Sequence, residues 1–522
     1  MREKYFLAID AGTGSVRAVL FDTEGNQRGI AQREWFHHED SRYPGSMDFD
    51  WDTNWNLAKT CIKEVLKTSK IDPSDILSIS TTCMREGIVL YNKSGQEIWA
   101  CANVDARSTN EAIYLKNLDS NLEEELYAKS GQTFTLNAIP RILWVKNNLP
   151  EVYEKIDKIG MFNDWLIYKL SGVLSVDPSN GSTSGLIDLS TRDWDKSIAE
   201  SCGIKSDIFP PVCESGTLIG HVNKESAKNT GLSEGTPLVV GGGDAQLGSI
   251  GVGVTENNQG AIFGGSFWQY EYNTDKWNPK PSCRVRVNCH ASKGLLQYEA
   301  LAFKPGLVMR WYRDAFLDYE KVLAKEQNKS VYEIMDDKAK DIPVGSYGVM
   351  CTFSDIMNFL NWKHASPTFT NFQLEADKFN KVTFYRAILE NTAYLAYGHV
   401  NLVKEETGKI PSYITFAGGA SYSDLWSQIL CDVLGMEVRI PVIKEATAFG
   451  AAILAGVGVG YYSDIKNATK KLVKIEKSLT PNMENHKKYM ELYSKWREIY
   501  AAQLKLSDQK LTEYLWIAPG CN

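Results

Sequence analysis

The sequence lacks features that would define several other classes of protein. No apolar run reaches the roughly 18–20 residues that cross a bilayer, and the N-terminus MREKYFLAIDAG has no apolar signal-peptide region. No Lys/Arg-rich stretch is interleaved with aromatics, and the net charge of -7 disfavours a nucleic-acid backbone as partner. We therefore expect a soluble cytoplasmic protein that binds neither membranes nor nucleic acid.

Two further motifs are missing. The ten cysteines are scattered, with no CxxC pair and no His at zinc-ligand spacing, which indicates reduced thiols and not a disulfide framework or a structural zinc site. The P-loop pattern G-x-x-x-x-G-K-[ST] is also absent. Any nucleotide must therefore be held by a different kind of turn.

The length of 522 residues predicts two domains, because single hydrophobic cores stop growing beyond roughly 250–300 residues. The first strand, Tyr5–Asp10, passes through a glycine turn into a second, Val16–Phe21, and a third follows, which predicts an antiparallel meander. A similar strand, turn and strand recur over 259–272, as a faint internal duplication. The glycine-rich 248–253 marks the domain junction.

Several later strands end in polar or glycine-rich turns. Ile76–Thr82 leads to Arg85, Leu238–Gly243 leads to Asp244, and Tyr413–Phe416 leads to two glycines. Ligands of α/β sheets bind at such strand ends. Four helices are also predicted: about 51–67, a long one over 384–406, one over 423–434, and a segment over 446–456 whose Ala and Gly residues allow close backbone approach. The tail beyond Tyr461 is interpreted as charged surface helix.

The first glycine turn is a candidate phosphate site. It runs Asp10-Ala11-Gly12-Thr13-Gly14-Ser15, so its amides can converge on an anion while two hydroxyls add donors. A tight polar hairpin is the alternative. A dinucleotide-binding turn is excluded because that motif opens a helix, whereas a β-branched run follows here.

Asp244 follows three glycines, Gly241–Gly243, where a general base can stand at the mouth of a strand end. A helix N-cap is the alternative, and one Asp can fill both roles. Paired with Asp10 it suits phosphoryl transfer, in which one carboxylate assists a hydrated Mg²⁺ and the other accepts a hydroxyl proton. We therefore assign Asp244 as catalytic and Asp10 and Asp244 to the metal.

Arg85 and Glu86 form a cation-anion pair that can donate to and accept from the hydroxyls of a polyol, although a surface ion pair is the alternative. Gln246, just after Asp244, is assigned to the same substrate. An aromatic wall against a sugar-like ligand could come from tryptophans, which are more often packing residues; the candidates are Trp51, Trp55, Trp165 and Trp268, of which Trp268 is assigned to the substrate.

Over nearly its full length the chain resembles the FGGY carbohydrate kinases, through AIDAGTGSVRAVLFD, CMREGIVLYN, VVGGGDAQLG, FAGGAS and KEATAFGAAI. The resemblance implies an α/β fold of two actin-like (ribonuclease H-like) domains around a nucleotide cleft, with ATP and Mg²⁺ as cosubstrates. It implies an N-terminal domain (1–250) holding substrate and base, a nucleotide-binding domain (251–460) and a helical tail (461–522). It allows a homodimer and leaves any regulatory protein partner undefined.

The resemblance also assigns the nucleotide contacts. The first phosphate turn comprises Gly12, Thr13, Gly14 and Ser15, and the second comprises Gly265 and Ser266. The adenine pocket includes Gly306 and Arg310, and the adenosine motif includes Gly418, Gly419 and Ser423. Gly265 and Ser423 depart from the family pattern, in which Thr and Asn are common, and this leaves the selectivity for the base open.

Three other stretches, ACANVDAR, MRWYRDAF and LWIAPG, point within the family to a member that phosphorylates the terminal hydroxyl of linear 4,5-dihydroxy-2,3-pentanedione, the precursor of the quorum-sensing signal autoinducer-2. A pentulose or polyol kinase of the same family is the nearest alternative. A non-catalytic actin-like sugar sensor is a third reading, which the presence of both Asp10 and Asp244 disfavours.

Overall fold

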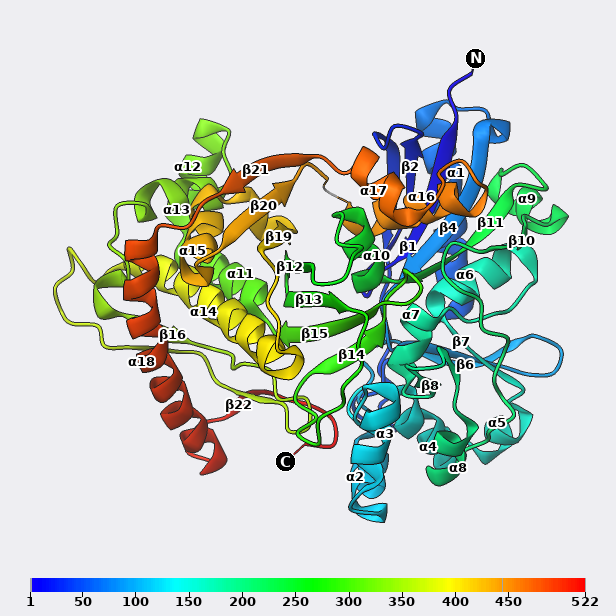
Figure 1. The fold of residues 1–522 in the computed structure, drawn as a ribbon, viewed down its shortest axis with the longest axis horizontal. Helices are drawn as coiled ribbons and strands as arrows, with labels where there is room; N and C mark the ends of the chain where they lie inside the picture. Colours follow the sequence, from blue (N-terminus) through cyan, green and yellow to red (C-terminus); the bar gives the residue numbers. More distant parts are fainter. Residues whose placement is uncertain (1, 444, 522) are drawn as a thin grey trace.

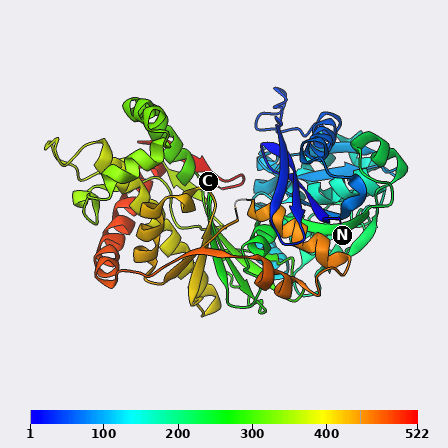
Figure 2. The same cartoon turned by 90° about the horizontal axis from the view of Figure 1, so that it is seen from above.

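The computed structural model describes residues 2–443 and 445–521. The chain folds into two lobes, each built around a mixed β-sheet with helices on its faces (Figures 1 and 2). Within these residues no helix is long and apolar enough to cross a membrane. All ten cysteines are free thiols.

The first sheet opens with the expected antiparallel meander, which is confirmed by the pairing of β1 with β2 and of β2 with β3. Beside the meander, β1, β4 and β11 run parallel, so their carboxyl ends share one edge. In spatial order the strands are β10 (Leu218–His221), β11 (Pro237–Gly243), β4 (Ile76–Cys83), β1 (Tyr5–Ala11), β2 (Ser15–Asp22) and β3 (Gln27–Glu34).

The second sheet repeats this order. Again an antiparallel hairpin is followed by two parallel strands and then an antiparallel edge strand, so the duplication seen in the sequence is real at the level of topology. Its strands are, in spatial order, β14 (Arg286–Cys289), β15 (Leu296–Ala302), β13 (Trp268–Thr274), β12 (Gly260–Gly264), β19 (Tyr413–Ala417), β20 (Glu437–Pro441) and β21 (Ile475–Leu479).

Alternate residues of β1 face opposite sides of the first sheet, as the two-residue period of a strand requires. Leu7 and Ile9 pack with α1 (Trp51–Ser69) and α6 (Phe162–Ser171). Phe6 and Ala8 pack with α16 (Ala446–Gly458), although this helix lies about 200 residues beyond the sheet. The second half of the chain therefore returns to cover the first sheet.

Helix α16 crosses α10 (Asp244–Gly251) in direct backbone contact. A Cβ added at Gly450 would lie 1.9 Å from the carbonyl oxygen of Leu247, and one at Gly251 would lie 1.9 Å from that of Ala446. The predicted close approach of the Ala/Gly-rich segment is thus confirmed. Gly248–Gly253, expected to be a junction, mostly belongs to α10, and a non-helical segment over 252–259 then leads to β12 of the second sheet.

The remaining helices and small sheets surround these two sheets. In the N-terminal lobe, β5 (Ile88–Tyr91), β6 (Glu97–Cys101) and β7 (Lys158–Met161) form a small sheet, with α2 (Thr109–Leu118), α3 (Leu122–Ser130), α4 (Ala138–Asn148) and α5 (Pro150–Lys155) around it. The second lobe carries α11 (Pro305–Phe316), α12 (Asp318–Gln327), α13 (Val331–Ala339), α14 (Lys381–Thr407) and α15 (Asp424–Leu434).

The tail beyond Tyr461 is only partly the surface helix that its charge pattern predicts. Helices α17 (Ile465–Leu472) and α18 (Met483–Asp508) are present. Strand β21 lies between them and extends the second sheet, while β22 (Tyr514–Ile517) pairs with β17 (Lys363–Ala365). Short strands of this kind, supplied by distant parts of the chain, carry little local signal.

Candidate active site

Three charged side chains stand at the carboxyl ends of three neighbouring parallel strands. Asp10 is the second-last residue of β1, Arg85 follows β4 by two residues, and Asp244 follows β11 directly. Asp10 and Asp244 are close enough for their charges to interact. The sheet thus brings together the carboxylates that lie 234 positions apart in the sequence.

The three glycines before Asp244 allow the protein itself to approach the strand closely. A Cβ at Gly241 would lie 1.6 Å from the carbonyl oxygen of Thr81, and one at Gly243 would lie 3.0 Å from the Cγ atom of Arg85. Asp244 is the first residue of α10, and its carboxylate accepts a hydrogen bond from the amide of Ala245 at 2.7 Å. The N-cap interpretation of Asp244 is therefore wrong, because Gly243 holds the cap position and Asp244 is the first residue inside the helix. The strand-mouth position remains open to ligand, since the Asp244 side chain is 39% exposed.

Arg85 connects the two lobes through carboxylates on both sides. Its Nε lies 3.1 Å from Asp244 Oδ1, and its Nη1 donates to Glu299 on β15 of the second sheet. Arg286 on β14 extends the network, with Nη2 2.5 Å from Glu86 Oε1 and Nη1 3.3 Å from Glu299 Oε1. Arg85 and Glu86 thus form no simple surface pair but belong to a buried network across the cleft.

The ionisation of this network follows from its burial. Burial alone would raise the pKa of the fully buried Glu299, but Arg85 and Arg286 hold it at about 2. Glu271 lies opposite Glu299 on β13; burial and the neighbouring negative charge raise the pKa of Glu271 well above its usual range. Two arginines therefore keep Glu299 charged, whereas Glu271 has a raised pKa because it is buried beside that charge.

The pKa values of the two proposed site carboxylates, Asp10 and Asp244, are also shifted. Burial raises the pKa of Asp10 to about 7 despite the nearby Arg17, and the charges of Asp244 and Glu445 add to the rise. Burial likewise raises the pKa of Asp244, and Arg85 opposes this rise. Perturbed carboxylates of this kind cluster at sites that handle protons or cations.

A cavity of about 460 Å³ opens beside Asp244. Predicted residues Thr13, Arg85, Glu86 and Asp244 line it from the N-terminal lobe. Its other walls were not anticipated from the sequence, and they come from both lobes and from the last residues of the chain: Asn103, Val104, Ala106, Thr109, Leu136, Phe267, Gln269, Arg286, Leu301, Phe303, Trp362, Trp516, Ile517, Ala518, Pro519 and Cys521. We call it the acceptor cavity.

A second cavity, of about 660 Å³, lies in the second lobe, and we call it the nucleotide cavity. Most of the residues that the sequence assigns to the second phosphate turn, the adenine pocket and the adenosine motif line it. They are Gly265, Ser266, Gly306, Arg310, Gly419 and Ser423, together with Gly264, Met309, Arg313, Ser330, Tyr332, Glu333, Asp336, Tyr385, Ala420, Tyr422 and Trp426.

Close packing of backbone turns explains the glycines of the nucleotide cavity. A Cβ at Gly306 would lie 2.1 Å from the carbonyl oxygen of Gly265. Gly418 adopts φ +92°, and its added Cβ would meet the carbonyl oxygen of Gly264 at 2.7 Å. Because β12 and β19 are adjacent parallel strands, their two turns lie side by side. The hydroxyl of Ser423 caps α15 by accepting from the amide of Trp426 at 2.9 Å.

The first glycine turn lies between β1 and β2 at the same edge as Asp10. Its peptide carbonyls point towards the protein. The indole Nε1 of Trp35 donates to the carbonyl oxygen of Gly12 at 3.0 Å and lies 3.1 Å from the carbonyl oxygen of Thr13. Asn103 donates to the Thr13 hydroxyl at 3.0 Å. Gly14 is exposed, with open space where a Cβ would stand, and Ser15 is buried at the start of β2.

Two predicted substrate residues do not line the acceptor cavity. Gln246 is fully buried in α10, below the strand end. Trp268 is buried in the core of the second lobe, where its ring lies 5.1 Å from that of Trp426 and 5.2 Å from that of Phe416. None of the four tryptophans named from the sequence lines the acceptor cavity; the aromatic residues that do are Phe267, Phe303, Trp362 and Trp516.

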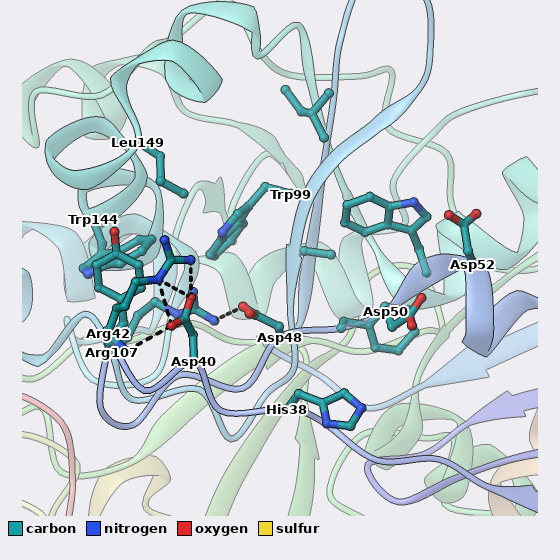
Figure 3. A pocket seen from close by; sticks show the side chains of 15 residues that line it. His38, Asp40, Arg42, Asp48, Asp50, Asp52, Trp99, Arg107, Trp144 and Leu149 are labelled. Atoms are coloured by element: carbon teal, nitrogen blue, oxygen red, sulfur yellow. Dashed lines mark hydrogen bonds and ion pairs between the residues drawn. The ribbon is translucent and has the colours of Figure 1, made fainter.

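A third cavity, of about 390 Å³, lies in the N-terminal lobe and is drawn in Figure 3. Arg42 pairs with Asp40 at 2.6 Å, and the guanidinium of Arg107, which pairs with Asp48, lies over the rings of Trp99 and Trp144. Trp51 lines this cavity, whereas Trp165 is in the core. Its arginines are already paired with carboxylates, and none of the proposed catalytic residues line it.

The sequence matches two family models in succession. Residues 5–251 match the N-terminal domain, and residues 274–459 the C-terminal domain, of the FGGY family of carbohydrate kinases. The chain belongs to this family. It is accordingly an ATP-dependent kinase, and the two lobes are the actin-like domains that the resemblance predicted.

Curated relatives of this FGGY kinase include the "Autoinducer-2 kinase" of Klebsiella pneumoniae, 46% identical over 517 residues that cover 99% of this chain and 97% of the relative. The protein of the same name from Escherichia coli K12 is 47% identical over 517 residues, with 99% and 98% covered. Among solved structures, a xylulose kinase from Rhodospirillum rubrum has a TM-score of 0.82 at 24% identity and covers 97% of this chain and 99% of its own. That likeness shows the shared fold.

The site of this FGGY kinase suits a divalent cation held in part by substrate. Among residues 2–443 and 445–521 no three His, Cys, Asp or Glu side chains are grouped as a metal cluster. Mg²⁺ typically uses one or two carboxylates and completes its shell with water and phosphate oxygens. The Asp10 and Asp244 carboxylates fit such an ion, because they lie close enough for the charge of Asp244 to raise the pKa of Asp10.

Proposed function

We propose that the protein transfers the γ-phosphoryl group of ATP to the terminal hydroxyl of linear 4,5-dihydroxy-2,3-pentanedione, giving phospho-autoinducer-2 and ADP in the processing of a quorum-sensing signal. The observation that carries the kinase chemistry is the position of Asp244, which lines the acceptor cavity at the carboxyl end of β11, the same sheet edge at which β1 ends in Asp10 and the first phosphate turn. The relatives named "Autoinducer-2 kinase", matched over 99% of the chain, support the choice of acceptor.

In this reaction the nucleotide cavity and the acceptor cavity each bind one of the two substrates. ATP lies in the nucleotide cavity with Gly265, Ser266 and Gly419 around it, and Gly12–Ser15 contact its phosphates from the opposite lobe. The acceptor lies against Arg85 and Glu86. Asp244 accepts the proton of the attacking hydroxyl, and because phosphoryl transfer is loose, its main task is to orient that hydroxyl in line with the γ-phosphorus.

Mg²⁺ would be held by Asp10 and Asp244 together with phosphate oxygens, and when bound it neutralises charge on the β- and γ-phosphates. The residues of the chain complete the electrostatic environment. Arg17 lies 3.9 Å from Asp10 and 2.8 Å from Glu445, at the point where α16 returns to the first sheet. Arg17 is thus able to orient the Asp10 carboxylate from the second strand.

The proposal also covers organisation and location. The N-terminal domain, 1–250, supplies the acceptor residues and base, 251–460 supplies most of the nucleotide cavity, and 461–522 packs against both. We place the enzyme in the cytoplasm, where ATP is available, and the proposal is compatible with a homodimer.

A pentulose kinase is the second candidate, because several structures of this fold carry the name xylulose kinase. The deciding experiment is a coupled ADP-release assay of purified protein with ATP and dihydroxypentanedione, xylulose, ribulose or glycerol, with mass spectrometry of the products. The proposal predicts the highest kcat/KM with dihydroxypentanedione. Higher kcat/KM with a pentulose would overturn the acceptor assignment, and no turnover with any acceptor would favour a sugar sensor.

A further inference from the structure

The last residues of the described chain form part of the acceptor cavity. Strand β22 pairs antiparallel with β17, with Trp516 opposite His364 and Ile517 opposite Lys363. After this strand the chain turns along the opening between the lobes, and five of its residues line the cavity: Trp516, Ile517, Ala518, Pro519 and Cys521. We call residues 514–521 the C-terminal strap.

The strap is anchored to the second lobe by aromatic packing and backbone hydrogen bonds. The Trp516 ring stacks on Phe303 with centroids 4.2 Å apart and lies edge-on to Trp362 at 5.2 Å. The amide of Ala518 donates to the carbonyl of Trp362 at 2.9 Å, and Lys304 Nζ donates to that of Leu515 at 3.2 Å. These contacts fix the position of the strap over the cavity.

The far end of the strap touches the N-terminal lobe. Gly520 has φ +77°, and a Cβ there would lie 2.8 Å from the Cβ of Ala112 on α2. The Sγ atom of Cys521 is 4.0 Å from the hydroxyl of Thr135. Figure 2 shows this red segment reaching from one lobe towards the other across the opening. The strap therefore spans the mouth of the cleft as well as lining it.

The strap gives the acceptor cavity two unlike walls. One wall carries the charges of Arg85, Glu86 and Asp244, which suit hydroxyl and carbonyl oxygens. Another part of the lining, made of strap residues with their aromatic partners Phe303 and Trp362, is apolar.

We propose that the C-terminal strap is the specificity-determining wall of the acceptor cavity, limiting acceptors to short, open-chain polyhydroxy carbonyl compounds. The inference rests on the proposed kinase function but not on which acceptor is best. The strap supplies five of the residues that line the cavity together with Asp244, so its side chains set the room left for an acceptor whose hydroxyl lies at the base. We expect Trp516 and Pro519 to exclude a longer chain or a sugar ring. None of the residues that line the nucleotide cavity belongs to the strap.

The test compares variants that widen and narrow this wall. Trp516→Ala and a chain ending at residue 513 widen it, whereas Pro519→Trp narrows it. Leu511→Ala is the matched control, because Leu511 is 69% exposed and lies just before the strap without lining the cavity. Each protein is assayed with ATP and glycerol, dihydroxypentanedione, xylulose or fructose, and KM is measured for ATP and for each acceptor.

Widening should raise the KM of the best acceptor. The ratio of kcat/KM for fructose to kcat/KM for the best acceptor should rise by about tenfold, which is the usual effect of losing apolar contact with a substrate. Pro519→Trp should lower kcat/KM for the five-carbon acceptors more than for glycerol. The KM for ATP should stay unchanged in all variants, which distinguishes the strap from a general structural role, and Leu511→Ala should behave as the natural protein.

Two results would contradict the proposal in different ways. If the natural protein turns over an acceptor but the ratios between acceptors are the same in every variant, the strap has no role in specificity and the kinase function stands. If the natural protein transfers phosphate to no acceptor, the proposed function fails and the strap proposal with it. Should the truncated chain not fold, Trp516→Ala and Pro519→Trp still decide the question, because they shift the ratios in opposite directions.

Discussion

The nucleotide cavity and the acceptor cavity are built by different means. The nucleotide cavity is shaped by backbone turns that touch each other, as the 2.1 Å from an added Cβ at Gly306 to the Gly265 carbonyl shows. The acceptor cavity is shaped by long side chains from both lobes, joined by ion pairs around Arg85 and Arg286. The first should therefore be sensitive to added volume, and the second to lost charge.

The largest effect is expected from Arg85→Ala. It would leave the fully buried Glu299 with Arg286 as its main partner, and breaking a buried ion pair from one side costs about 3–5 kcal/mol. Chemical denaturation should show this loss, and the KM of the acceptor should rise. The double variant Arg85→Met/Glu299→Met should recover most of the stability but not the acceptor affinity. Near-natural stability of Arg85→Ala would show that the network is not a unit.

Gly306→Ala tests the nucleotide side. The added Cβ must displace the Gly265 turn, and overpacking of this kind costs about 1–3 kcal/mol. The KM for ATP should rise while the KM for the acceptor stays near its natural value. Gly419→Ala is the matched control for stability, because an added Cβ there meets no protein atom within 4 Å. Equal losses of stability in the two variants would refute the turn-on-turn explanation.

Buried carboxylates behind the acceptor cavity should make stability depend on pH. Burial raises the pKa of Asp177 to about 7, and Asp177 accepts hydrogen bonds at the start of α7 (Pro178–Gly181). The unfolded chain releases this proton near pH 3.9, so between about pH 4 and pH 7 the folded state holds more protons, and stability falls as pH rises.

Asp177→Asn removes this titration and keeps a side chain that can cap the helix. Relative to the natural protein, the variant should gain in Tm between pH 5 and pH 8. Parallel Tm profiles for the two proteins over that range would show that Asp177 does not titrate as its surroundings imply.

The smallest effect is expected in the cavity of Figure 3. Arg42→Ala removes a highly exposed ion pair with Asp40, and solvent screens such pairs strongly. Steady-state assays should give unchanged kcat and KM values for both substrates. A clear change in either KM would mean that this cavity communicates with the cleft, and the contrast between the two functional cavities would then be incomplete.

The sequence identified residues that line one cavity together better than it identified the lining of the acceptor cavity, for a physical reason. Glycine turns after buried strands are local signals, and Gly265, Gly306 and Gly419 indeed meet in one cavity. The acceptor walls depend on tertiary pairing: Arg286 and Glu299 lie on ordinary-looking strands, and Trp516 on a four-residue strand at the end of the chain. Trp268 shows what such signals cannot give: neither its residue type nor its position beside a glycine turn reveals that its ring lies in the core.

The general architecture could be predicted from the sequence because strand periodicity and glycine placement repeat in both halves of the chain. What the pattern did not reveal is that α16 returns to cover the first sheet. The Ala and Gly residues of α16 predicted close packing but did not identify α10 and the first sheet as its partners. A contact between distant segments cannot be read from the local sequence of either segment.

The most direct test of the central claim is a comparison of the natural protein with Asp244→Asn in single-turnover phosphoryl transfer, with calorimetric binding of ADP and of the acceptor measured on the same samples. Asp244 should orient and deprotonate the acceptor hydroxyl without holding either ligand in place. Both ligands should therefore still bind, and the rate of transfer should fall by a factor of about 10²–10⁴. Transfer at the natural rate by Asp244→Asn would contradict the account.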